Sequence, residues 1–197
     1  MEKFFAHGKF LVSAEYAILH GAKGLAIPLN KGQTLQFSKE KKQNVKAQIK
    51  WTAFDNINYP WHEIIFDKGD KSIVKTNYIR AAKTLKTLIE LAPASFFEDD
   101  MDYRFETYLQ FDKSWGWGSS STLVSLIAQC TGANPYDLYD ATFKGSGFDL
   151  ACATTKGPIL YHLEKGKPIA EPVHFSPTFK ENIYFVYLGK KQSSLKS

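Results

Sequence analysis

The chain alternates between strand-like and helix-like patterns of apolar residues. The most regular strand pattern covers residues 101–111, where apolar and polar side chains alternate as expected for a strand with one buried face. Shorter apolar runs predict further strands, at 4–6, 10–12, 24–29, 34–38, 45–54, 61–66, 159–163 and 183–188. These strands are numerous enough to form an extensive sheet.

Helical spacing is clearest over residues 76–91, where apolar side chains recur every three or four positions and Pro93 follows the last of them. A second apolar helix is expected to begin within the segment 114–122, and shorter helices are expected at 136–143 and 148–153. Strands and helices that mix in this way along one chain predict an α+β fold.

The composition is that of a globular protein with a mildly basic surface. Hydrophobic residues make up 44% of the 197 residues, and a 15% share of aromatic residues excludes a disordered chain. The net charge of +5 suits anionic ligands such as nucleotides, and it also suits nucleic acid. Five lysines gather around one predicted turn and are interpreted as a solvated face, with nucleic-acid binding as the alternative. They are Lys39, Lys41, Lys42, Lys46 and Lys50.

Neither the cysteines nor the N-terminus indicates export. Cys130 and Cys152 form neither a metal-binding pattern nor a disulfide framework, which fits a reducing compartment. The segment Met1–Phe5 is too short and polar for a signal peptide, and no apolar run approaches membrane-spanning length. We therefore expect a cytoplasmic protein without a membrane partner.

The segment Ser114–Thr122 combines two glycines with a run of hydroxyl residues ahead of an apolar helix. Gly116 and Gly118 permit a tight turn close to a ligand, and serines favour a helix start. Such a turn directs free N–H groups and the positive end of the helix dipole to one point, which predicts an anion site, most commonly for phosphate. It is not a Walker A loop, because no Gly-Lys-Ser/Thr closes it. An ordinary capped loop is the alternative interpretation.

Two further polar stretches, His7–Lys9 and Ser146–Asp149, interrupt apolar surroundings. Together with the loop they supply the parts of a phosphoryl-transfer site, namely an anion cradle, a positive charge, an oxygen ligand for a divalent metal and a carboxylate. Lys9 is the candidate charge, Ser120 the candidate Mg²⁺ ligand and Asp149 the candidate carboxylate. Taken singly, Lys9 is an ordinary exposed lysine, and Asp149 is a first-turn residue stabilised by the helix dipole.

Three ordered segments resemble the motifs of the GHMP kinases, the superfamily of galactokinase, homoserine kinase, mevalonate kinase and phosphomevalonate kinase. Gly8–Gly21 looks like the family's first motif. Gly116–Ser121 is similar to the second, Gly-Leu-Gly-Ser-Ser-Ala, which wraps the ATP phosphates. Gly145–Ala151 resembles the segment with the catalytic aspartate, in a wording similar to phosphomevalonate kinases and a less characterised GYDIA branch.

The resemblance implies a GHMP-kinase N-terminal domain with a left-handed βαβ unit, a fold like that of a ribosomal protein, normally followed by a ferredoxin-like C-terminal domain. Residues 1–180 would form the ATP-binding domain, and residues 181–197 would begin a truncated or missing C-terminal domain. Residues 189–197 resemble a loop that enters a helix. The family's third glycine-rich motif is absent from this sequence, so a complete active site could require further chain.

For function, the resemblance implies an ATP- and Mg²⁺-dependent small-molecule kinase with phosphomevalonate or mevalonate as acceptor. Asp149 would accept or orient the acceptor proton, and Lys9 would hold that group and stabilise developing charge. Glu15, which would position the Lys9 loop, would lie on the substrate side with Ser146 and Gly147. The Ser120 hydroxyl would bind Mg²⁺. The nucleotide would lie along Ser114, Trp115, Gly116, Trp117, Gly118, Ser119 and Ser120.

Two departures from the family pattern leave other functions open. Trp117 occupies a position where most members have leucine. Leu138 occupies that of a glutamate that binds Mg²⁺ in mevalonate kinases, with Asp137 and Asp140 nearby as candidate substitutes. A nucleotide-binding or regulatory module without turnover is therefore the first alternative, and a nucleic-acid-binding domain is the second. The expected partner is a small-molecule substrate and not nucleic acid. Sugar and homoserine acceptors and a decarboxylase-type activity stay open, as does a homodimer.

Overall fold

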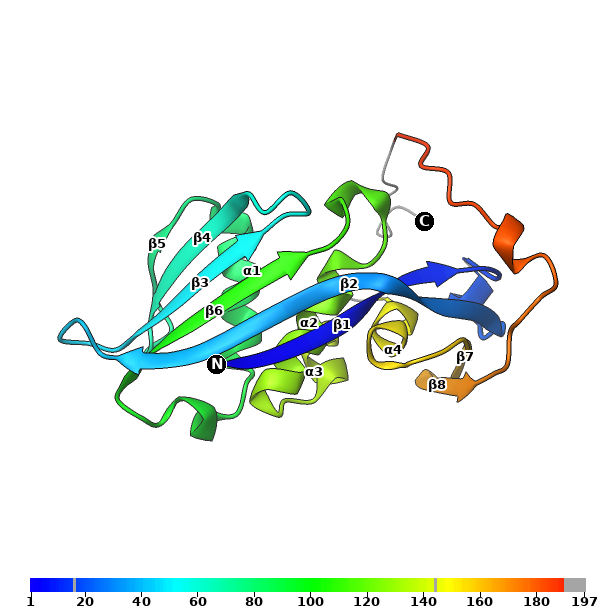
Figure 1. The fold of residues 1–197 in the computed structure, drawn as a ribbon. Helices are drawn as coiled ribbons and strands as arrows, with labels where there is room; N and C mark the ends of the chain where they lie inside the picture. The colour runs from blue at the N-terminus through cyan, green and yellow to red at the C-terminus, as the bar shows by residue number, and fades with distance from the viewer. Residues whose placement is uncertain (16, 144, 190–197) are drawn as a thin grey trace.

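The computed structural model describes residues 1–15, 17–143 and 145–189, which form a mixed α/β fold (Figure 1). An eight-stranded sheet has the order β5-β4-β3-β6-β2-β7-β8, with β1 also paired to β2. Among the described strands, β3 and β6 are parallel neighbours and the other pairs are antiparallel. The strands are β1 Glu2–Leu11, β2 Gly24–Lys41, β3 Gln48–Phe54, β4 Pro60–Asp67, β5 Ile73–Thr76, β6 Met101–Leu109, β7 Ile159–Glu164 and β8 Lys167–Pro172.

The helices of the described chain pack on one face of this sheet. Figure 1 shows α1, α2 and α3 behind the sheet, and α4 nearer to β7 and β8. Short 3₁₀ turns connect several elements, at Ala17–His20, Ala94–Phe97, Lys113–Trp115 and Lys180–Asn182. The α-helices are α1 Ile79–Glu90, α2 Ser119–Thr131, α3 Pro135–Thr142 and α4 Phe148–Thr154.

The apolar side chains of β6 explain why helices cover this face. Tyr103 and Phe105 are buried in the main core, where the Phe105 ring stacks on Trp51 of β3 at 4.9 Å between centroids. Leu85 and Leu88, from the apolar stripe of α1, are buried in the same core. Removal of these large side chains from water supplies the main stabilisation, since apolar burial is the dominant favourable term in folding.

Most of the predicted elements are confirmed. β3, β4, β6 and β7 correspond to predicted strands, and α1 to α4 to predicted helices, with ends shifted by a few residues. The runs 4–6 and 10–12 belong to one irregular strand, β1. The runs 24–29 and 34–38 are likewise parts of the single strand β2, which pairs with β1 on both sides of the register shift between His7 and Lys9.

The strand predicted at 183–188 is wrong. These residues are not in a strand in the structure, and no described strand pairs with them. The apolar residues of this segment are not buried as those of a core strand would be, since Tyr184 and Leu188 are 79% and 86% exposed. Two short strands were not predicted. β5 pairs with β4, and β8, which contains charged residues and two prolines, pairs with β7 at the edge of the sheet.

The finer expectations about domains stay predictions. They are the left-handed βαβ unit, the boundary at residue 180 and the ferredoxin-like C-terminal domain. The loop and helix expected at 189–197 fall on residues 190–197, which lie outside the described residues. Within the described chain, no helix has the length and apolar character needed to cross a bilayer.

Candidate functional site

Lys9 reaches the site through an irregularity in β1. The register of β1 against β2 shifts between His7 and Lys9. Gly8 lies at this shift, and a Cβ atom there would lie 3.2 Å from the carbonyl oxygen of Trp117. The missing side chain lets the glycine loop approach β1, and the N–H group of Lys9 donates to the Trp117 carbonyl at 3.0 Å. The loop and the strand are therefore joined beside Lys9.

The glycine loop turns through two residues in the left-handed region. Gly116 has φ 77°, and Gly118, the N-cap of α2, has φ 85°. A Cβ atom on Gly118 would lie 2.8 Å from Ser121 Oγ and 3.0 Å from Lys9 Cγ. The loop, the start of α2 and the Lys9 side chain therefore pack together, as the predicted anion site requires.

The hydroxyl residues that begin α2 are of two kinds. Ser121 and Thr122 are buried, and Thr122 Oγ1 donates to Gln33 Oε1 at 2.7 Å while Ser121 Oγ donates to a carbonyl of the loop at 2.9 Å. Ser119 and Ser120 are half-buried, and we find no hydrogen bond from their hydroxyls within residues 1–15, 17–143 and 145–189. The first N–H groups of a helix also lack partners within it. These groups are available to a bound ligand.

Asp149 approaches Lys9 from α4. Its Oδ1 atom lies 3.1 Å from Lys9 Nζ, and the two side chains are 24% and 16% exposed. The ammonium group also lies 4.5 Å from the centre of the Phe148 ring, a cation–π distance. Asp149 Oδ1 is buried and accepts no well-formed hydrogen bond from the described residues, although Lys9 is within ion-pairing distance. This oxygen therefore keeps its capacity to accept a proton.

The turn ahead of α4 contains the two predicted substrate-side residues, Ser146 and Gly147. Gly147 is the N-cap of α4 and has φ 79°. The carbonyl of Ser146 accepts a hydrogen bond from the Tyr161 hydroxyl of β7. In this structure both residues fix the start of the helix that carries Asp149.

Two neighbours of Asp149 remain protonated at neutral pH. Burial raises the pKa of Tyr139 to about 12, with a further contribution from the charge of Asp149. Burial and the same charge raise the pKa of Cys152 to about 12.

Other predicted site residues have different surroundings. Glu15 is exposed and forms no ion pair with a described residue, so no contact supports its predicted role in positioning Lys9. Ser114 donates through its N–H and hydroxyl to Asp112 at 2.8 and 2.7 Å, which lowers the pKa of that carboxyl. Trp115 and Trp117 pack edge to face at 4.8 Å between centroids.

The structure adds contacts that sequence reasoning missed. The Phe185 ring packs on Trp117 at 5.0 Å and on Phe10 at 6.2 Å between centroids. Phe148 lies within a recognised motif, yet only the fold shows its ring beside Lys9. No local signal marks Tyr161, because its hydrogen bond joins a strand to a turn.

Among the described residues, no cluster of ligating side chains marks a metal site. Leu138, at the position of the mevalonate-kinase glutamate, is 1% exposed and has no ligating atom. Within the described chain, no group of three or more His, Cys, Asp or Glu residues could hold a metal ion. A metal at this site would therefore have fewer than three His, Cys, Asp or Glu ligands from the described residues.

The lysines considered for nucleic acid are largely neutralised by aspartates. Lys39 and Lys42 pair with Asp99 and Asp100 at 2.6 and 2.5 Å. Lys46 and Lys50 pair with Asp67 and Asp102 at 3.0 and 3.2 Å. This pairing weakens the case for a phosphate-binding basic face.

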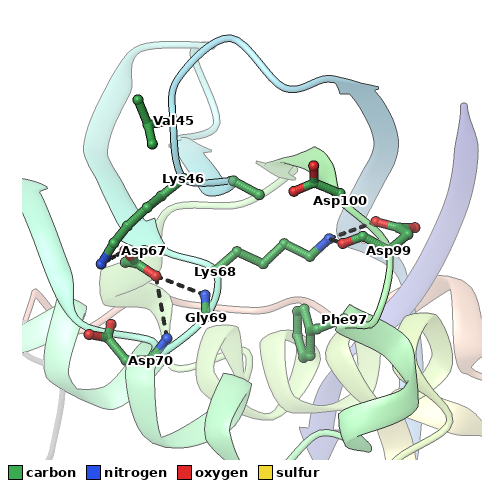
Figure 2. A pocket seen from close by; sticks show the side chains of 10 residues that line it. Val45, Lys46, Asp67, Lys68, Gly69, Asp70, Phe97, Asp99 and Asp100 are labelled. Carbon is green, nitrogen blue, oxygen red and sulfur yellow. Dashed lines mark hydrogen bonds and ion pairs between the residues drawn. The ribbon is translucent and has the colours of Figure 1, made fainter.

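A pocket of about 330 Å³ lies in the same region, near the end of β2 that is remote from Lys9 (Figure 2). Lys68 crosses it and is 3% exposed, and its Nζ donates to Asp99 Oδ1 at 2.6 Å and to the Met101 carbonyl at 3.0 Å. We interpret this network as structural, since its buried charges are paired. The lining residues are Val45, Lys46, Ala47, Asp67, Lys68, Gly69, Asp70, Phe97, Asp99 and Asp100.

Comparison with known proteins identifies kinases of similar fold. No protein-family model and no curated protein matches the sequence. The mevalonate kinase of L. major, solved in complex with R-mevalonate, is 17% identical with a TM-score of 0.59, and the match covers 90% of this chain and 53% of that one. A phosphomevalonate kinase of Streptococcus pneumoniae, in complex with phosphomevalonate and AMPPNP, is 17% identical with a TM-score of 0.57, covering 82% and 50%.

A sugar kinase is as similar as these two. The D-glycero-D-manno-heptose 1-phosphate kinase of Bacteriodes thetaiotaomicron is 14% identical with a TM-score of 0.61, covering 88% of this chain and 60% of that one. These matches show that the chain has the fold of GHMP-superfamily kinases, as the motifs predict. The chain spans between half and three-fifths of the length of these three proteins.

Proposed function

We propose that this chain is the ATP- and Mg²⁺-binding domain of a small-molecule kinase of GHMP type. One observation carries the proposal. The Lys9 side chain packs against Gly118 at the start of α2 and pairs with Asp149 of α4, so that three motifs distant in sequence meet at one point. The three structures of similar fold described above are kinases, which supports this reaction class.

The nucleotide phosphates would lie at the N-terminus of α2. The free N–H groups of its first turn and the positive end of its dipole favour a phosphate there. Gly118 lets Lys9 and Ser121 pack closely at this helix start, since a Cβ atom there would lie 3.0 Å from Lys9 Cγ and 2.8 Å from Ser121 Oγ. The half-buried hydroxyls of Ser119 and Ser120 would also bind the phosphates or the metal ion.

The residues present fit a magnesium ion bound together with the phosphates. The Ser120 hydroxyl is a hard oxygen ligand and is not engaged elsewhere in the described residues. Magnesium in proteins commonly keeps several waters and uses few protein ligands. A site without a cluster of carboxylates, as in the described part of this chain, is compatible with that preference. When bound, it would neutralise charge on the transferring phosphoryl group.

Asp149 and Lys9 would act on the acceptor. In the transfer, the acceptor oxygen forms a bond to the γ-phosphorus, the bond to the β–γ bridging oxygen breaks, and ADP leaves. The acceptor proton would pass to Asp149 Oδ1, which is free of hydrogen bonds from the described residues. Lys9 would hold the acceptor oxygen and stabilise the charge that develops on it.

The proposed acceptor is a mevalonate-pathway alcohol, phosphomevalonate or mevalonate. The Ser-Gly-Phe-Asp-Leu-Ala motif supports this choice by resemblance. Sugar acceptors are the main competitors, because the similar folds include a heptose-phosphate kinase. The acceptor must be decided by assay.

The test is Mg²⁺-dependent release of ADP, with mevalonate, phosphomevalonate and several sugars offered separately. Asp149→Asn should lower turnover by orders of magnitude and leave ATP affinity nearly intact. Asp100→Asn is the matched control, because this carboxylate is 75% exposed and lies on the remote pocket. Turnover that survives Asp149→Asn would remove Asp149 from the mechanism. ATP binding without release for any acceptor would favour the regulatory module.

A further inference from the structure

A buried tyrosine of β7 contacts the turn from which Asp149 projects. Tyr161 is 0% exposed and packs in a cluster with residues of β2 and α4. Its hydroxyl donates to the carbonyl of Ser146. Ser146 directly precedes Gly147, the N-cap of α4, and Asp149 is the second residue of that helix. One hydrogen bond therefore ties the sheet to the backbone that carries the carboxylate.

The turn is enclosed by aromatic side chains. A Cβ atom on Gly147 would lie 3.2 Å from Tyr136 Cε1 and 3.3 Å from Tyr161 Oη. A Cβ atom on Gly145 would lie 3.1 Å from Tyr139 Oη. Gly147 is also in the left-handed region, at φ 79°. Close packing and this backbone conformation leave the turn little freedom to rotate.

Among the described residues, none orients the carboxylate through a hydrogen bond of good geometry. Asp149 Oδ1 accepts none of good geometry from the described residues, and its recorded partner is the ammonium group of Lys9. A lysine ammonium imposes little direction, because it is a compact charge on a flexible chain. The direction of Asp149 therefore depends on the backbone of the first turn of α4, which Tyr161 holds.

We propose that Tyr161 is a positioning residue for Asp149. Its hydroxyl fixes the Ser146–Gly147 peptide and thereby the direction in which the carboxylate meets Lys9 and an acceptor. The catalytic consequence rests on the proposed kinase function. The geometric consequence, a defined Asp149–Lys9 pair, does not require turnover.

Tyr161→Phe keeps the ring and removes the hydrogen bond. Tyr136→Phe is the matched control, since that ring packs on the same glycine and no hydrogen bond from its hydroxyl is found among the described residues. In the ADP-release assay, Tyr161→Phe should lower kcat by about five- to tenfold and leave the KM for ATP unchanged. The control should keep the native kcat. In an Asp149→Asn background, Tyr161→Phe should cause no further loss, because it acts through Asp149.

A second measurement works without turnover. The acetylation rate of Lys9 by acetic anhydride, followed by mass spectrometry, reports how well Asp149 shields the ammonium group. Tyr161→Phe should raise this rate several-fold, and Tyr136→Phe should not. If the native chain releases no ADP with any acceptor but Lys9 labelling rises in Tyr161→Phe alone, the kinase function fails and the positioning role stands.

The inference is overturned if Tyr161→Phe lowers stability but changes neither kcat nor Lys9 labelling relative to the control. It is also overturned if the kcat loss is the same with and without Asp149. Should Tyr161→Phe not fold, Gly147→Ala presses a methyl group against both the Tyr136 ring and the Tyr161 hydroxyl and displaces the same turn. That variant should also raise Lys9 labelling, and an unchanged rate would reject the positioning role.

Discussion

A single methyl group on Gly118 tests the packing of the candidate phosphate loop. Gly118 is the N-cap of α2 and has φ 85°. In Gly118→Ala the new Cβ would lie 2.8 Å from Ser121 Oγ and 3.0 Å from Lys9 Cγ. Both contacts are shorter than ordinary van der Waals distances. The substitution therefore strains the backbone and displaces Lys9 together with the loop.

The size of the effect follows from two contributions. The left-handed conformation costs a residue other than glycine roughly 1–2 kcal/mol. The contacts add to this cost unless Lys9 moves, and a displaced Lys9 no longer pairs correctly with Asp149. We expect a loss of about 2 kcal/mol in the free energy of unfolding. We also expect ATP affinity to fall by at least about tenfold, which corresponds to about 1.4 kcal/mol.

Gly132→Ala is the matched control. Gly132 ends the same helix at φ 77°, and a Cβ atom there would have no neighbour within 4 Å. Urea denaturation and calorimetric titration with Mg²⁺-ATP should show that Gly132→Ala loses stability through its backbone alone and keeps native ATP affinity. Equal ATP affinities in the two variants would refute the link between the Gly118–Lys9 contact and phosphate binding.

Further predictions concern the charge network and the thiols. Lys68→Met should lower the free energy of unfolding, measured in urea, by about 3 kcal/mol, because Lys68 is buried. Lys39 pairs with the same Asp99 but is exposed, so Lys39→Met should cost under about 1 kcal/mol. Equal losses in the two variants would contradict this reasoning. Burial opposes ionisation of Asp99, but hydrogen bonds from Lys39 and Lys68 outweigh it and hold the pKa well below its usual range. The stabilisation is therefore complete above about pH 4 and is lost as the pH falls further, and Asp99→Asn should flatten this part of the acid denaturation profile. Burial raises the pKa of both thiols to about 12, so Cys130 and Cys152 should resist a disulfide reagent at pH 8 in the native protein and react after unfolding.

The glycine turn and the start of α2 could be predicted from sequence because their signals lie next to one another in the chain. Gly116, Gly118 and the serines that follow specify a turn and a helix start by local rules alone. The alternation along β6 and the spacing along α1 were equally local signals, and both are confirmed.

The pairing of the charged residues could not be predicted. Glu15 was the nearby acid in sequence, but the partner of Lys9 is Asp149. This contact depends on the register shift at Gly8 and on the way α4 packs against β1, neither of which has a local signature. Tyr161 was missed for the same reason, since its hydrogen bond is set by the fold.

β8 was missed, and the strand at residues 183–188 was wrongly predicted, for a different reason. The strand β8 is mostly exposed, so its sequence carries no apolar alternation, and backbone pairing with β7 defines it. The apolar run 183–188 has the composition of a strand but no described partner, and composition alone does not make a strand.

The most direct test of the central claim is the binding of Mg²⁺-ATP to this chain, measured by calorimetric titration. The account predicts saturable binding at one site, weakened in Gly118→Ala and nearly unchanged in Asp149→Asn. Absence of binding, or binding of native strength in Gly118→Ala, would contradict the assignment of a nucleotide phosphate site to the start of α2.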